Sequence, residues 1–96
     1  MRYLTVDGMM SGTGIRDSVA GGYLLPSDLG LSSALASRIS EWLRSYAAAH
    51  FDGYRDKEQI AILDEEGLNI CAAVRDEVRA SKVEYYSDAL MRRQIL

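Results

Sequence analysis

Two apolar stripes with helical spacing constrain the fold of this chain more than any other feature of its sequence. Apolar residues recur at steps of three and four, which is the spacing of one face of a helix. The first stripe predicts a helix over residues 33–50 and consists of Leu35, Ile39, Trp42, Leu43 and Tyr46. The second consists of Ile60, Leu63, Gly67, Ile70, Cys71, Val74 and Val78. Each helix therefore needs an apolar surface to cover.

Polar residues mark the ends of these helices. Ser32 or Ser33 can accept a backbone hydrogen bond at the start of the first helix, and Asp52-Gly53 ends it. The second helix is predicted to start at Asp56, which has Gln59 three residues later in the spacing of a capping box.

Strand-like segments lie near both ends of the chain. Residues 2–6 and 83–86 are rich in Tyr, Thr and Val and alternate in polarity. The tail over 88–96 is predicted as a helical turn or a short strand. These elements predict an α+β fold with one domain over residues 1–96, in which two amphipathic helices pack on one face of a small sheet of N- and C-terminal strands.

The segment between the first strand and the first helix is rich in turn formers. Residues 7–14 are predicted as a loop, 15–23 as a short strand, a hairpin or an irregular segment, and Pro26–Asp28 as a turn. Gly12-Thr13-Gly14 is expected to be a flexible turn and not a phosphate-binding loop, because no lysine precedes Lys57 and no third glycine has the spacing of a dinucleotide site.

Charge and cysteine content narrow the function classes. The 96 residues carry 11 Lys and Arg against 14 Asp and Glu, a net charge of −3, and form no basic stripe. This balance disfavours nucleic acid and anionic membranes and suits a basic protein partner. A single cysteine, no visible leader and no apolar run of about 20 residues predict a cytoplasmic protein.

Few residues offer chemistry. His50 is the only histidine, and it is expected to cap the C-terminus of the first helix, where a partial positive charge is favoured. Cys71 is expected to be an inert core residue. Without a second histidine or a cysteine pair, we expect no metal, no cofactor and no catalytic residue. Asp64-Glu65-Glu66 would splay about 100° apart per residue on a helix and are expected to be solvated, or else to meet a basic partner.

Packing roles can be assigned to a few other residues. Trp42 and Tyr46 share one helical face and are expected in the core. Tyr85 and Tyr86 must point to opposite sides of their strand, so one of them faces away from the helices. Gly67 on the second stripe indicates a close approach to another backbone, or a break with the helix starting near Asp64.

The order of these segments resembles a group of small bacterial proteins, the immunity proteins of polymorphic and contact-dependent growth-inhibition toxin systems. The resemblance spans roughly residues 14–86. It rests on Gly14-Ile15-Arg16, Gly21-Gly22-Tyr23, Pro26 to Ser32, the helix with Trp42 and Tyr46, Asp64 to Leu68, and Val83-Glu84-Tyr85.

The resemblance implies a protein without catalytic activity that binds and neutralises a cognate toxin domain, such as a nuclease with a basic cleft. An acidic inhibitor would speed association with such a cleft, and buried anchors would supply affinity. The residues expected to bind the toxin combine acidity with aromatic area: Asp52, Tyr54, Asp56, Glu58, Glu65, Glu66 and Tyr86.

Two alternatives stay open. One is a scaffold or adaptor domain that self-associates, for example as a homodimer, through an open sheet face or edge. The other is a small enzyme that uses Asp or Glu in a shallow cleft. An inhibitor should have an acidic patch, a scaffold an exposed apolar patch, and an enzyme a concave pocket with a perturbed carboxylate.

Overall fold

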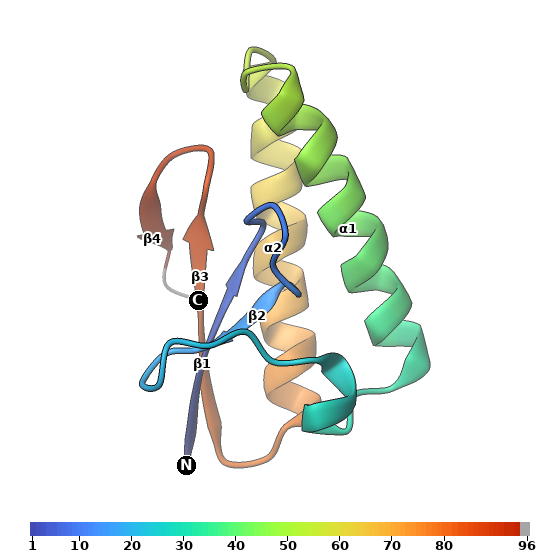
Figure 1. Cartoon of the computed structure of the whole chain (residues 1–96), viewed down its shortest axis with the longest axis vertical. Coiled ribbons are helices and arrows are strands. Elements are labelled where there is room, and N and C mark those ends of the chain that lie inside the picture. The colour runs from blue at the N-terminus through green and yellow to red at the C-terminus, as the bar shows by residue number, and fades with distance from the viewer. Residues whose placement is uncertain (95–96) are drawn as a thin grey trace.

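The computed structural model describes residues 1–94 and contains two long helices and four strands (Figure 1). In chain order the elements are β1 (Arg2–Asp7), β2 (Ile15–Asp17), the 3-10 helix η1 (Pro26–Leu29), α1 (Ser33–Phe51), α2 (Lys57–Glu77), β3 (Ser81–Ser87) and β4 (Arg92–Gln94). The predicted order of strand, irregular segment, helix, helix and strand is confirmed.

The four strands form one mixed sheet in the order β2-β1-β3-β4. The central pair, β1 and β3, is parallel, with Val6 opposite Tyr85 and Asp7 opposite Tyr86, whereas each edge strand is antiparallel to its neighbour. Because the central strands are parallel, their C-terminal ends and the segments that follow them lie at the same end of the sheet.

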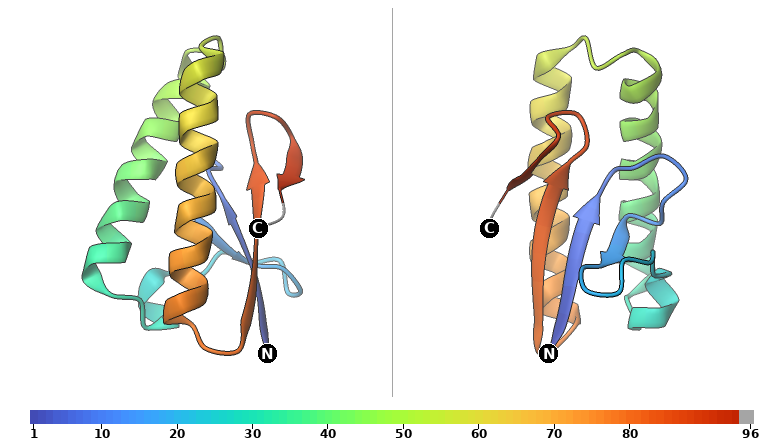
Figure 2. Two further views of the ribbon diagram at one scale, coloured as in Figure 1. Left: turned by 180° about the vertical axis from the view of Figure 1, so that it is seen from behind. Right: turned by 60° about the vertical axis from the view of Figure 1, so that its left-hand side comes forward.

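Both helices cover the same face of this sheet (Figure 2). The predicted two-layer α+β fold, with a sheet built from the two ends of the chain, is therefore confirmed. No helix of the described residues, 1–94, lies on the other face (Figure 2). Figure 1 also shows that the helices extend beyond the sheet where α1 connects to α2, so that the C-terminal end of α1 projects past the strands.

Polar side chains cap the N-terminal ends of both helices, as the sequence predicts. The Ser32 side chain accepts from the backbone N of Leu35, and α1 ends at Phe51, before Gly53 with its φ of +75°. The Asp56 carboxylate accepts from the backbone N of Gln59 at 3.1 Å. These caps satisfy backbone N–H groups that have no partner within the helix.

Gly67 lies where α2 crosses the sheet, and its role differs from both expectations. The helix is continuous from Lys57 to Glu77, so there is no break near Asp64. The close neighbour is a side chain instead of a backbone, because a Cβ at position 67 would overlap Cε1 of Tyr85 and stand 2.5 Å from its Cζ. The missing side chain makes room for an aromatic ring from β3.

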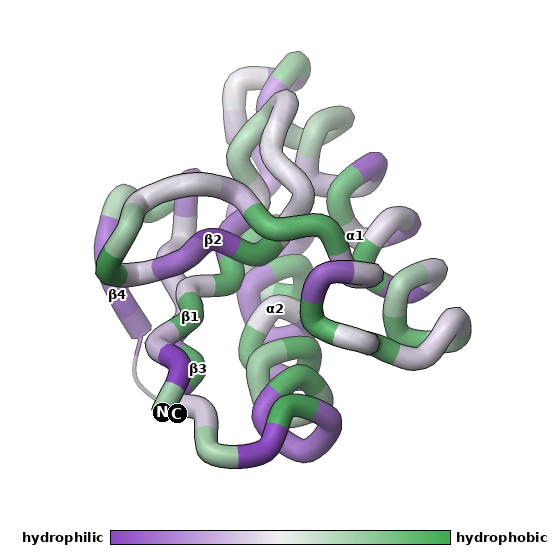
Figure 3. The backbone as a smooth tube through the Cα atoms, turned by 60° about the horizontal axis from the view of Figure 1, so that its bottom comes forward, coloured by the Kyte–Doolittle hydropathy of each residue, from purple (hydrophilic) through white to green (hydrophobic). Residues whose placement is uncertain are grey.

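The core between the two layers contains the apolar stripes of both helices. Trp42, Tyr46, Cys71 and Tyr85 are buried there, as expected for the first three. The indole Nε1–H of Trp42 donates to the carbonyl of Leu63 at 2.8 Å, which joins α1 to α2. Figure 3 shows hydrophobic and hydrophilic residues in turn along both helices, as their amphipathic pattern requires.

The segments that the sequence left open form small, ordered pieces. Residues 15–17 are strand β2, which continues into a turn and an isolated bridge between Arg16 and Tyr23. Pro26 begins η1 where a turn was predicted. Of the two alternatives for the tail, the short strand is correct, as β4 pairs with β3; residues 95–96 lie outside the described part of the chain.

Neither helix combines the length and the apolar composition needed to cross a membrane, within the part of the chain that the structure describes.

Candidate functional site

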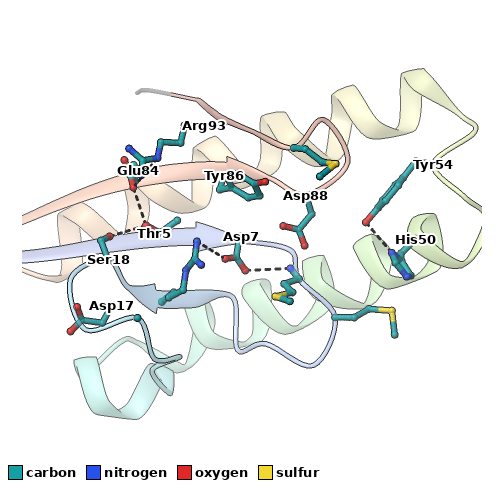
Figure 4. A pocket seen from close by; sticks show the side chains of 15 residues that line it. Thr5, Asp7, Asp17, Ser18, His50, Tyr54, Glu84, Tyr86, Asp88 and Arg93 are labelled. Atoms are coloured by element: carbon teal, nitrogen blue, oxygen red, sulfur yellow. Dashed lines mark hydrogen bonds and ion pairs between the residues drawn. The ribbon is translucent and has the colours of Figure 1, made fainter.

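The face of the sheet without helices contains a hollow of about 730 Å³, which we call the open-face hollow. Its floor is formed by side chains on the outer face of the strands, including Thr5, Asp7, Arg16, Glu84 and Tyr86. Its far wall comes from His50 and Tyr54, at the end of α1 that projects past the sheet, and from Asp88 after β3 (Figure 4).

Asp7 is the most buried charged residue of the floor, with 2% of its surface exposed. Its carboxylate accepts from the Tyr23 hydroxyl at 2.8 Å and from the backbone N of Met9 at 3.3 Å, and it lies 3.4 Å from the guanidinium of Arg16. Burial, followed by the bond to Asp7, raises the pKa of Tyr23. Asp7 is thus a buried charge with partners, as buried charges require.

A second polar network crosses the floor from β2 towards β4. Thr5 shares a hydrogen bond with Ser18 at 2.7 Å and donates to the carboxylate of Glu84 at 3.1 Å. The same carboxylate lies 3.7 Å from the guanidinium of Arg93. The carboxylates of Asp7 and Glu84 therefore each have a guanidinium partner within the protein.

Asp88 differs from these carboxylates. Among residues 1–94, no cationic side chain lies within ion-pair distance of it. Burial, and next the negative charge of Asp7, raises its pKa to about 6, although Arg16 and His50 act in the opposite direction. Asp88 is therefore a half-buried carboxyl whose charged form is disfavoured by its surroundings.

Aromatic side chains stand on both sides of Asp88. Figure 4 shows its carboxyl between the side chains of Tyr86 on β3 and Tyr54 beyond α1. Tyr54 has a positive φ of 55°, and its ring packs edge-on against that of Tyr46. The Tyr54 hydroxyl oxygen lies 3.3 Å from Nδ1 of His50 and forms a hydrogen bond with it. Burial raises the pKa of Tyr54, so its hydroxyl stays neutral at physiological pH.

Methionines surround the far end of the hollow. Met9 and Met10 follow β1, and Met91 precedes β4, so the parallel central strands bring them to the same end of the sheet. Met9 is 52% exposed and Met91 is 76% exposed. Methionine is flexible and polarisable, and exposed methionines are common on surfaces that bind other proteins.

The loop that carries Asp88 is held by a buried carboxylate on α2. Asp64 accepts from the hydroxyls of Tyr46 at 2.9 Å, Tyr85 at 2.6 Å and Ser87 at 2.7 Å. The Tyr46 and Ser87 hydroxyls in turn accept from the backbone N of Ala89 at 3.2 Å and of Leu90 at 3.1 Å. Burial raises the pKa of Tyr46 to about 12, which keeps the donating hydroxyl protonated.

The burial of Asp64 corrects the expectation that the run at 64–66 is a solvated helix face. Only 4% of Asp64 is exposed. The reason is its position: it follows Ile60 by four residues and precedes Gly67 by three, so it lies on the inward stripe. Its negative charge is compatible with burial because three hydroxyls donate to it.

Glu65 and Glu66 line a separate groove between the two helices, on the side away from the hollow. Glu66 is bound by Arg38 of α1 through two bonds of 3.1 and 2.8 Å, and this bond lowers the pKa of Glu66. Glu65 is exposed, as is the neighbouring Ile62 at 66%.

Three other predicted residues belong to the connection between the helices. Asp52 pairs with Arg55 at 2.8 Å, Asp56 caps α2 and Glu58 is exposed in the first turn of α2. The seven predicted toxin-binding residues are thus distributed over three surfaces. Of them, Tyr54 and Tyr86 line the open-face hollow, and Glu65 and Glu66 line the groove between the helices.

Asp7, Arg16, Asp88 and the methionines of the hollow were not predicted as site residues. For Asp7 the available signal was its position directly after the strand predicted over residues 2–6, whereas the sequence offers no comparable signal for Arg16, Asp88 or the methionines. Cys71 is fully buried, and burial raises its pKa to about 12, in line with an unreactive thiol. Within residues 1–94, no group of three or more His, Cys, Asp or Glu side chains could hold a metal ion.

Comparisons of this chain with protein-family models, with curated proteins and with solved structures find no match.

Proposed function

We propose that this protein binds a basic protein partner through the open-face hollow and inhibits it without catalysis, in the manner of an immunity protein that neutralises a toxin domain. The supporting observation is the composition of the hollow. Four carboxylates line it, from Asp7, Asp17, Glu84 and Asp88, against the two guanidinium groups of Arg16 and Arg93. This excess of negative charge favours a basic surface.

The other features of the hollow suit a protein partner. Tyrosines are common anchors of protein interfaces because they offer a large apolar area and a polar hydroxyl. Tyr54 and Tyr86 line the hollow (Figure 4). Met9, Met10 and Met91 also line it. A partner that covers this surface would bury the exposed methionines and meet the unmatched charge of Asp88.

The proposed inhibitor can be tested with a pair of charge-reversal variants. The tagged protein is used to capture partners from its native host, and the captured toxin domain is then produced together with each variant. Asp88→Lys should lose protection of the toxin-producing cells. Asp76→Lys makes the same change of charge on an exposed part of α2 outside the hollow and should protect like the wild type.

Several outcomes would contradict this proposal. Equal protection by Asp88→Lys would remove the hollow from the interface. Capture of the protein's own chain alone would favour the scaffold function, in which the open sheet face binds a second copy. Capture of neither a toxin nor a second copy would reject both protein-binding functions.

A second function has one specific observation in its favour. The open-face hollow is concave and contains a carboxyl with a raised pKa, the two features expected of an enzyme that uses Asp or Glu for acid–base chemistry. We propose it as the alternative because a pKa of about 6 would allow Asp88 to exchange protons near neutral pH. A turnover that is detected with the wild type and abolished in Asp88→Asn would establish it.

A further inference from the structure

We infer that the open-face hollow contains a binding site for the guanidinium group of an arginine side chain, centred on Asp88 and flanked by Tyr54 and Tyr86. This inference rests on the proposed function, because it specifies which group of a basic partner the hollow receives. It names one side-chain chemistry, arginine, as the occupant.

The charge of Asp88 is not balanced by a cationic group within residues 1–94. Arg16 lies 3.4 Å from Asp7, and Arg93 lies 3.7 Å from Glu84, so both guanidinium groups of the hollow already have a carboxylate partner. Among residues 1–94, Asp88 has no such partner. A cation that enters the hollow would meet a carboxylate with free acceptor positions.

An incoming cation would stabilise the charged form of Asp88, which burial and the charge of Asp7 disfavour. The carboxyl is half-buried and faces the negative charge of Asp7, so the hollow disfavours its ionised form. A bound cation would offset both the loss of solvation and the repulsion between the two carboxylates. The same surroundings would oppose an anionic ligand.

The aromatic side chains beside Asp88 favour arginine over lysine. The aromatic side chains of Tyr86 and Tyr54 lie on either side of the Asp88 carboxyl (Figure 4). A guanidinium is planar, can donate two parallel bonds to one carboxylate and stacks on aromatic rings, whereas an ammonium is a compact, strongly hydrated charge. The flexible methionines Met9 and Met91 offer apolar surface for the methylene groups of an arginine side chain.

The loop geometry supports a preformed site. The backbone of Ala89 and Leu90 is fixed by the hydroxyls of Tyr46 and Ser87, both bonded to Asp64. Asp88 is therefore carried by a loop that hydrogen bonds within the protein anchor to α2, and such anchoring lowers the entropic cost of binding.

The test is a titration of the isotope-labelled protein followed by NMR, with N-acetylarginine amide as the probe. N-acetylcitrulline amide has almost the same shape without the charge, and N-acetyllysine amide has the charge without the planar group. We expect saturable shifts of the backbone amides around Asp88 with the arginine probe, clearly weaker shifts with lysine and none with citrulline. Asp88→Asn should weaken arginine binding at least about tenfold, while Asp76→Asn should not change it.

The pH dependence gives an independent measurement. Binding at about pH 7.5 should be several-fold tighter than at about pH 5, because protonation of Asp88 removes the charge that attracts the probe. The charged groups that act on Asp88 are Asp7 on β1, Arg16 on β2, His50 on α1 and Asp64 on α2, and the titratable hydroxyls of Tyr23 and Tyr54 also lie within its influence. Histidines titrate in the same range, so His50→Gln is measured in parallel and should keep most of the pH dependence, whereas Asp88→Asn should lose it.

Equal responses to arginine and citrulline, or a response that survives Asp88→Asn, would overturn the inference. A lysine response as strong as that of arginine would reject a guanidinium site in favour of a general cation site. Failure of the probe together with capture of a partner that Asp88→Lys no longer neutralises would reject the arginine site and keep the proposed function. Binding of the arginine probe, when no protein partner is captured, would keep the arginine site and reject the proposed function.

Discussion

Gly67 decides how closely α2 can approach the sheet. Replacing a glycine inside a helix by alanine normally adds about 1 kcal/mol of stability through helix propensity. Here the added Cβ would overlap the ring of Tyr85, which is held in place by its bond to Asp64. Overpacking of this kind costs about 1–3 kcal/mol.

Gly67→Ala is therefore expected to lower the free energy of unfolding, against the propensity trend. Ala61→Gly is the matched control, since position 61 is exposed on the same helix and reports propensity alone, with a loss of about 1 kcal/mol. Both can be measured by urea unfolding. A Gly67→Ala variant that is more stable than the wild type would contradict the packing of Tyr85 under α2.

Asp88 makes the stability of the fold depend on pH. Below about pH 4 its carboxyl is neutral in both the folded and the unfolded chain, and above about pH 6 it is charged in both. The folded state then bears the cost of a half-buried charge beside Asp7. The wild type should thus lose stability relative to Asp88→Asn as the pH rises from about 4 to about 6.

The expected loss is about 1 kcal/mol, because solvent screens a carboxyl that is only half-buried. Thermal unfolding of both proteins over this pH range measures the difference. A constant difference between the wild type and Asp88→Asn would show that Asp88 ionises as it would in the unfolded chain.

Among the structural elements, α1 depends on Trp42 for its contact with α2. The indole is 3% exposed, packs against Tyr46 at 5.4 Å and Tyr85 at 6.1 Å between ring centroids, and donates to the carbonyl of Leu63. Trp42→Ala should cost about 3–5 kcal/mol of stability. Trp42→Phe keeps most of the packing and should lower the stability less, chiefly through loss of the hydrogen bond to Leu63. A melting curve of Trp42→Ala equal to that of the wild type would place α1 in a different orientation.

The loop after β3 depends on the Tyr46 hydroxyl. This hydroxyl donates to Asp64 and accepts from the backbone N of Ala89. Tyr46→Phe removes both bonds, and we expect a loss of about 1–3 kcal/mol together with faster hydrogen exchange of the Ala89 amide. Tyr3→Phe, at an exposed tyrosine, is the control and should leave both unchanged. Unaltered exchange at Ala89 in Tyr46→Phe would show that Tyr46 does not anchor this loop.

For the molecule as a whole, the sheet edges argue against self-association through strands. Within residues 1–94, each edge strand has three paired residues. The β4 edge carries Arg92 and Arg93, whose like charges would oppose pairing with a second copy, and Tyr23 forms a bridge with Arg16 at the other edge. We expect light scattering to give the mass of a single chain, 10.7 kDa. A stable dimer would favour the scaffold function.

The arrangement of the whole molecule also explains which candidate residues the sequence could identify. Because side chains alternate along a strand, Tyr85 and Tyr86 must lie on opposite faces of β3. Since Tyr85 is buried beneath the helices, Tyr86 lies on the open face. Asp64 was accessible to the same kind of argument, since its spacing to Ile60 and Gly67 places it on the inward stripe. Asp88 could not be identified in this way, because nothing in the neighbouring sequence indicates which segment of the chain lies opposite Asp88 in the fold.

The sequence by itself determined the two helices, their caps, the two central strands and the α+β class, because these follow from local spacing and from hydrogen bonds between near neighbours. Only the tertiary structure decided the site. Thr5 and Glu84, which share a hydrogen bond across its floor, are 79 positions apart in the chain. The parallel pairing of β1 with β3 brings Asp7 and Asp88 into one hollow, and the length of α1 beyond the sheet adds His50 and Tyr54. Contacts of this kind depend on how the layers pack, so no local pattern of residues encodes them.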